Sequence, residues 1–139
     1  MEQKIRGLEV SSRVSIVAAQ PFVREMLVRQ QQAMGEGKGI VMDGRDIGTV
    51  VLPNATVKIF LTATPEARAE RRYKELLMKG EKHDYQNVLA DVRARDYQDT
   101  HRAAAPLRQA EDAVLVDTSE LNFDQSFEAL KKVIQDRAK

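Results

Sequence analysis

The chain has 139 residues, 42% of them hydrophobic and 31% charged, which is typical of a soluble globular protein of one domain, residues 1–139. No apolar run approaches the ~20 residues of a membrane span, the first ten residues hold no signal-peptide-like apolar segment, and cysteine is absent, which excludes disulfides and cysteine-held metals. The formal net charge of +1 gives no case for bulk nucleic-acid binding. We expect a cytoplasmic protein with no nucleic-acid or membrane partner.

The predicted elements alternate between helical and extended periodicity. A helix is expected over residues 21–34, because Pro21 lies near its start and Gly35 just past its end. The apolar stretch "GIVM" (39–42) then predicts a short buried strand, and "ATVKIFLTA" (55–63) predicts a second one. Thr64 supplies a capping hydroxyl for a helix that stops at Gly80.

The second half of the chain continues this alternation. Asp84 is expected to cap the next helix, "AVLVD" (113–117) predicts a third strand, and a last helix carries apolar side chains from Phe123 to Ile134 along one side. Strands separated by helical segments predict parallel pairing and an α/β fold.

Polar residues follow all three predicted strands, and ligands of open α/β sheets bind beyond the carboxyl ends of strands. The most unusual of these ends lies in "VMDGRDIGTVVLP" (41–53), where Asp43 and Asp46 flank Arg45. This segment is a candidate site, and the alternative interpretation is a turn with a structural Asp–Arg pair.

Two arginine-rich segments are further candidates. On a helix, Arg95, Asp99 and Arg102 of "RARDYQDTHR" (93–102) would share one face. Arginine suits two-pronged contacts to phosphate and carboxylate, and an aspartate between two arginines suggests a ribose hydroxyl held beside a phosphate. The cluster Arg68, Arg71 and Arg72 could also face an anion. For both segments the alternative is a solvated, salt-bridged helix surface.

These residues carry a resemblance to a known family. The segments "VSIVAAQPFVR", "DGRDIGTVVLPNATVKIFLTA", "RAERR", "RDYQDTHRAAAPL" and "DAVLVDTS" occur in the order and spacing of bacterial cytidylate kinases. The resemblance runs from about Ile5 to the C-terminus and implies transfer of the ATP γ-phosphoryl group to CMP or dCMP. It also implies a three-layer, P-loop nucleoside monophosphate kinase-like parallel sheet with flanking helices.

The resemblance implies a role for each matching residue. Asp46 would accept the cytosine amino group, which an aspartate can do chemically, while Ser15 and Arg24 would donate to the acceptor edge of the base. Arg95 and Asp99 would hold the sugar, and Arg45 and Arg102 would lie near the CMP phosphate. The mobile lid, about residues 66–100, would begin with Arg68, Arg71 and Arg72 facing ATP.

The resemblance further implies that the catalytic residues are Arg45, Arg71 and Arg102. Phosphoryl transfer depends on positioning and charge stabilisation, so no general base is required. His83 and His101 are expected at the surface without a role. ATP and Mg²⁺ would be co-substrates of the intact enzyme, and we expect no metal ligands and no firmly held cofactor on this chain.

The departure from the family pattern lies at the front of the chain. The phosphate-binding loop G-x-x-x-x-G-K-[ST] of such kinases is absent. "GEGKGI" (35–40) precedes a predicted strand and lacks a hydroxyl after its lysine. The sequence therefore looks like the C-terminal part of a cytidylate kinase without its first strands, and we expect this chain alone to be inactive.

Two alternatives follow from the missing loop: a non-catalytic nucleotide-binding module, and an oligomerising fragment. In the family's sheet the missing first strand lies between the strand ending at Asp43 and the strand at 57–61. We expect these two strands to pair directly, or a second copy of the chain to fill the gap through the unpaired strand edges.

Overall fold

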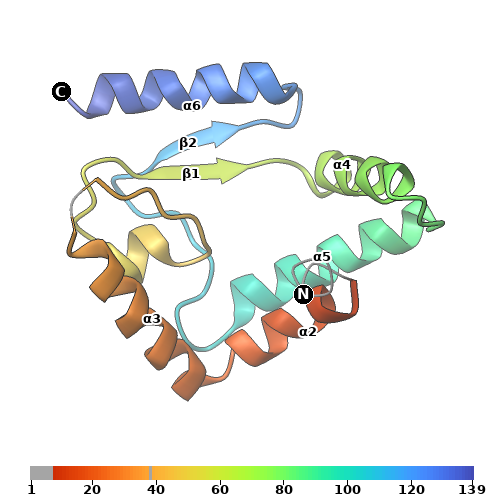
Figure 1. Ribbon diagram of the computed structural model, residues 1–139, viewed down its shortest axis with the longest axis horizontal. Coiled ribbons are helices and arrows are strands. Elements are labelled where there is room, and N and C mark those ends of the chain that lie inside the picture. The colour runs from red at the N-terminus through yellow and green to blue at the C-terminus, as the bar shows by residue number, and fades with distance from the viewer. Residues whose placement is uncertain (1–7, 38) are drawn as a thin grey trace. The chain divides into compact units, whose positions relative to one another are not determined.

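A computed structural model describes residues 8–37 and 39–139 (Figure 1). Its helices and strands follow the chain in the order α2 (Leu8–Ala18), α3 (Pro21–Gly35), η1 (Ile47–Val51), β1 (Ile59–Thr62), α4 (Pro65–Met78), α5 (Tyr85–His101), β2 (Val114–Asp117) and α6 (Phe123–Arg137). They form two compact units. Unit 1 comprises the described residues up to Asn54 together with Arg95–Arg108, and unit 2 comprises Ala55–Ala94 and Gln109–Lys139.

Unit 1 is built from α2, α3, η1 and the end of α5. Helix α3 starts with Pro21 at its first position and ends at Gly35, so the predicted helix is confirmed. It packs against η1, a turn of π-helix in which the amide of Val51 donates to the carbonyl of Asp46 at 3.1 Å. Val51 is 2% exposed and anchors this turn. The π-helix therefore fixes the backbone immediately after Asp46.

The predicted strand at 39–42 is not present. Residues 40–43 have no regular secondary structure, and the side chain of Val41 is 95% exposed. A strand needs a hydrogen-bonded neighbour, and the described residues of unit 1 contain no strand that could pair with this segment. The apolar composition of "GIVM" therefore predicted a strand for which the described part of unit 1 contains no partner.

Unit 2 contains a parallel two-stranded sheet. Strands β1 and β2 pair in register from Ile59 opposite Val114 to Thr62 opposite Asp117. These strands lie within the predicted ranges 55–63 and 113–117, and the predicted parallel pairing is confirmed. Helix α6 runs along β2 (Figure 1). The sheet and helices agree with an incomplete α/β fold.

The ends of α4 follow the predicted chemistry. The hydroxyl of Thr64 accepts from the amide of Ala67 at 3.2 Å, and Pro65 occupies the first position. At the other end, Gly80 has φ +75°, its amide donates to Leu77, and the amide of Glu81 donates to Leu76. This is the Schellman arrangement, in which a left-handed glycine ends a helix.

Helices α5 and α6 start with side-chain caps. The carboxylate of Asp84 accepts from the amide of Gln86 at 3.1 Å, as predicted for a cap of α5. Asn122 and Gln125 form a reciprocal capping box at the start of α6. The apolar side of α6 is largely uncovered, since Phe123 is 85% and Phe127 is 55% exposed.

Among residues 8–37 and 39–139, no helix combines the length and the apolar character needed to cross a membrane.

Candidate functional site

Asp46 is the most enclosed of the predicted site residues. It is 3% exposed, and its carbonyl accepts from the amides of Val50 and Val51. Its carboxylate forms an ion pair with Nη2 of Arg24, which lies on α3 and is 8% exposed. The two side chains come from positions 22 residues apart. Removing two charges from water costs free energy that their mutual attraction often does not repay. Stability alone therefore does not explain why this ion pair is buried.

Asp99, on the last part of α5, gathers two further arginines. Its side chain is 6% exposed, and its Oδ2 accepts from Nε of Arg45 at 3.0 Å. Nε of Arg95 lies 3.9 Å from the same oxygen. The arginine side chains remain 44% and 38% exposed respectively. A buried carboxylate therefore orients two cations that still reach solvent.

Arg102 is the residue that follows α5, and one nitrogen of its guanidinium group is hydrogen-bonded to the backbone. Its Nε donates to the carbonyl of Ala105 at 2.8 Å, and Ala105 has φ 49°. Its Nη2 is buried and has no hydrogen-bond partner among residues 8–37 and 39–139. Burial, followed by the positive charge of Arg24, lowers the pKa of Arg102 below its usual value. Cations that crowd one another in this way favour an added anion.

Arginines outnumber aspartates in the cluster formed by Arg24, Arg45, Asp46, Asp99 and Arg102. The pKa of Arg102 responds to Arg24, Asp46, Asp99 and Arg45, so all four groups act on Arg102 electrostatically. Together with Arg102 itself, three arginines accompany two aspartates in this group, so the positive charges outnumber the negative ones by one. The arrangement suits an anion such as a phosphate group. Ser15, on α2, is 6% exposed within the same unit.

The predicted lid arginines all lie on α4 in unit 2. Arg68 donates from Nε to the carbonyl of Ala63 at 3.0 Å, and Arg72 pairs with Glu75 at 2.8 Å. Arg71 donates to Thr118 and to the carbonyl of Leu121. All three arginines therefore make contacts within unit 2.

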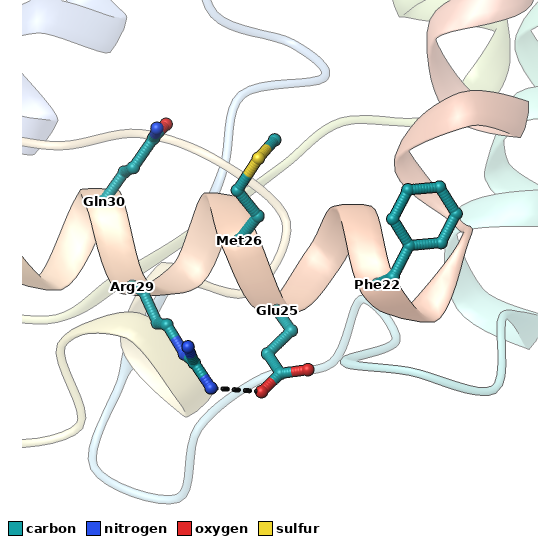
Figure 2. A pocket seen from close by; sticks show the side chains of 5 residues that line it. All are labelled: Phe22, Glu25, Met26, Arg29 and Gln30. Atoms are coloured by element: carbon teal, nitrogen blue, oxygen red, sulfur yellow. Dashed lines mark hydrogen bonds and ion pairs between the residues drawn. The ribbon is translucent and has the colours of Figure 1, made fainter.

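A surface pocket on α3 lies apart from the predicted residues. Figure 2 shows its lining, which comes entirely from this helix: Phe22, Glu25, Met26, Arg29 and Gln30. Glu25 and Arg29 pair at 2.5 Å across one helical turn. Because Arg24 is buried, it belongs to a different face of α3 from this pocket.

The histidines and acidic residues form no metal centre in the described part of the chain, where no group of three or more such side chains could hold an ion. His101 is exposed and stacks on Tyr97, with ring centres 4.0 Å apart. His83 pairs with Glu81 at 2.9 Å and its side chain is 30% exposed. Neither histidine contacts the arginine cluster in any described hydrogen bond or ion pair.

Sequence reasoning included Thr118 among the polar residues that follow the strands but gave it no role, and it missed Ala105. Thr118 is 4% exposed and accepts from Arg71, and Ala105 supplies the carbonyl that holds Arg102. Thr118 contacts Arg71, which is distant in the sequence, and Ala105 has an unusual backbone conformation. A local sequence pattern predicts neither feature. The proline after Ala105 was the one available signal of an unusual backbone there.

The matching family model and the similar proteins all carry the same description. A family model described as cytidylate kinase matches residues 1–136. The chain is 55% identical over 132 residues to a cytidylate kinase of Bacteroides thetaiotaomicron, a match that covers 95% of this chain and 58% of that protein. It is 52% identical over 139 residues to one of Flavobacterium johnsoniae (100% and 60% covered) and 53% identical over 133 residues to one of Streptococcus pneumoniae (96% and 60%). The chain thus spans about three-fifths of the length of these relatives and matches their C-terminal portion.

Proposed function

Since this chain belongs to the cytidylate kinase family, we propose that it supplies the acceptor-nucleotide site of an enzyme that transfers the ATP γ-phosphoryl group to CMP or dCMP. The observation that carries this proposal is the buried Asp46–Arg24 pair in a cluster where arginines outnumber aspartates. A carboxylate and a guanidinium side by side offer an acceptor and donors to a base edge. The excess charge suits the nucleotide phosphate.

Each part of CMP has a proposed partner in unit 1. Asp46 accepts the cytosine amino group, and Arg24 and Ser15 donate to the ring acceptors. Asp99 and Arg95 hold the ribose, because a buried carboxylate oriented by arginines can accept from sugar hydroxyls. Arg45 and Arg102 bind the phosphate, a role favoured by the partly exposed side chain of Arg45 and the unpartnered Nη2 of Arg102.

In this reaction the arginines position the acceptor phosphate and offset its charge, so that one of its oxygens can attack the γ-phosphorus of ATP. The lid arginines Arg68 and Arg72 would approach the transferring group after exchanging their present contacts. ATP and Mg²⁺ enter as co-substrates, and the described residues do not form a metal site of their own. The two-stranded sheet would be one part of a three-layer P-loop-type sheet.

A non-catalytic nucleotide-binding module is the second candidate function. The observation that favours it is that the residues proposed to bind CMP all lie in unit 1, whereas the lid arginines lie in unit 2. Such a module would use the same unit 1 site for CMP. Binding of CMP is therefore common to both functions, whereas transfer from ATP separates them.

The test is CMP binding to this chain by calorimetry, with Asp46→Asn as the variant. We expect CMP affinity to fall roughly 5- to 100-fold, because an unmade hydrogen bond in a closed site costs about 1–3 kcal/mol. UMP carries a carbonyl in place of the amino group, so its affinity should change far less.

Asp43→Asn is the matched control, since Asp43 is exposed in the same segment. We expect it to bind CMP as the unmodified chain does. Equal losses for CMP and UMP in Asp46→Asn would instead make Asp46 a structural residue.

A further inference from the structure

Helix α4 places an arginine at the end of each strand of the sheet. Arg68 donates to the carbonyl of Ala63, the residue after β1. Arg71 donates to the carbonyl of Thr118, the residue after β2. The strands are parallel, so both carbonyls lie at the same edge of the sheet. This edge is where open α/β sheets receive ligands.

Arg71 makes the more extensive of the two contacts. Its Nη1 donates to the hydroxyl of Thr118 at 3.3 Å, and its Nη2 donates to the carbonyls of Thr118 and Leu121, the latter at 3.3 Å. Thr118 is 4% exposed, and its hydroxyl donates to the carbonyl of Thr62 at 3.2 Å. The guanidinium therefore spans both ends of the loop Thr118–Leu121.

The same loop is tied to the first turn of α4. The amide of Thr64 donates to the hydroxyl oxygen of Ser119 at 2.9 Å, and that hydroxyl donates to the carboxylate of Asp117 at 2.6 Å. Hence the loop is bonded to the helix at its N-terminus through Thr64 and two turns later through Arg71. Loop and helix are connected at two separate points.

We propose that Arg71 is a positioning residue that fixes the loop Thr118–Leu121 to α4, in place of the catalytic role that the family resemblance implied for it. Both terminal nitrogens of Arg71 are used by loop oxygens, and a contact to a transferring phosphoryl group would require breaking these bonds. Because the helix and the loop are joined in this way, a displacement of α4 carries the strand-end loop with it.

The neighbouring Arg72 shows the contrast. Its ion pair with Glu75 lies within the helix, with side chains 28% and 44% exposed. Partly exposed pairs of this kind contribute little free energy and exchange easily. Of two adjacent arginines on α4, one is thus anchored to the sheet edge, and the other pairs within its own helix among residues 8–37 and 39–139.

The first test is amide hydrogen exchange of this chain, comparing Arg71→Met, Arg71→Lys and the control Lys74→Met. Lys74 lies three residues further along α4 and pairs with Glu70 within the helix. We expect exchange at residues 119–121 to become about tenfold faster in both Arg71 variants and to stay unchanged in the control. Lysine should not restore protection, because its point charge lacks the fork that spans two carbonyls. Unchanged exchange in Arg71→Met would overturn the proposal.

The second test rests on the proposed function and uses kinase assays of a complete enzyme of the family with the same substitutions. The residues of the proposed CMP site lie in unit 1, and the strand ends of unit 2 are where an α/β sheet would receive the other nucleotide, ATP. We expect Arg71→Met to raise KM for ATP about tenfold and to leave kcat within about twofold. A fall in kcat of a hundredfold or more, with loop exchange unchanged, would show that Arg71 acts on the reacting group.

The two proposals can fail separately. Faster loop exchange in a chain that does not bind CMP would retain Arg71 as a positioning residue and refute the proposed acceptor site. CMP binding together with unchanged loop exchange would retain the proposed acceptor site and refute Arg71 as a positioning residue.

Discussion

At the scale of single residues, Arg102 illustrates how a fold can hold a cation ready for an anion. The carbonyl of Ala105 orients its Nε, while its Nη2 is buried without a partner in the described part of the chain. Burial and Arg24 lower its pKa, which means that the charged form is less stable here than in water. Guanidinium keeps its proton even so. In the proposed function, a bound phosphate would offset this cost.

Arg102→Lys tests this view, because it keeps the charge and removes the planar fork. We expect CMP affinity, measured by calorimetry, to fall about tenfold, while cytidine, which has no phosphate, binds unchanged. Arg108→Lys is the control, since Arg108 is exposed six residues later. If CMP affinity stays within twofold, Arg102 belongs to an ordinary surface and not to a phosphate site.

At the scale of elements, the C-terminus of α4 depends on one backbone conformation. Gly80 has φ +75°, and the bonds from Gly80 to Leu77 and from Glu81 to Leu76 require it. An L-residue in this region costs roughly 1–2 kcal/mol. We therefore expect Gly80→Ala to lower Tm by about 3–8 °C, measured by circular dichroism.

Gly37→Ala is the matched control for this prediction. A Cβ at Gly37 would meet nothing within 4 Å, and its φ is not in the left-handed region. Its Tm should equal or slightly exceed that of the unmodified chain, since alanine restricts the unfolded state. A similar loss in both variants would indicate that the helix end is not the cause.

Elements with local signals could be predicted from the sequence, and contacts between distant residues could not. Thr64, Gly80 and Asp84 punctuate helices through bonds within a few residues, and the structure places them as predicted. The segment 40–43 could form a strand only beside a partner strand, so its apolar composition alone led to a wrong prediction. Arg45 and Asp99 meet across 54 residues, and only the family resemblance had suggested that both face one nucleotide.

At the scale of the whole molecule, the sheet of unit 2 is incompletely covered. Leu61 is 56% and Leu115 is 55% exposed, and the register places them on opposite faces. Parallel sheets are normally buried on both faces. The expectation that the segment ending at Asp43 would pair directly with β1 is wrong, because this segment is not a strand and β1 pairs with β2.

The remaining expectation is that a second copy of the chain fills the gap through the unpaired strand edges. Strand β1, "IFLT", carries no charged residue that would discourage pairing at the edge where no described strand lies. The side chain of Lys58, which precedes it, is 7% exposed and pairs with Asp112 at 2.9 Å. Because the Lys58 side chain is buried and paired, its charge does not prevent another strand from pairing with this edge. We therefore predict that this 139-residue chain associates with itself at micromolar concentration, which sedimentation velocity can measure as a mass above that of one chain.

Leu61→Lys should weaken this association, because it places a charge on the exposed face of β1. Leu77→Lys is the matched control: Leu77 is 48% exposed on α4 and lies outside the sheet. The prediction requires the two variants to differ, with Leu61→Lys shifted toward the mass of a single chain and Leu77→Lys unchanged. A chain that sediments as a monomer at 100 µM in all three forms, with both variants folded, would mean that the two exposed faces of the sheet are tolerated in water.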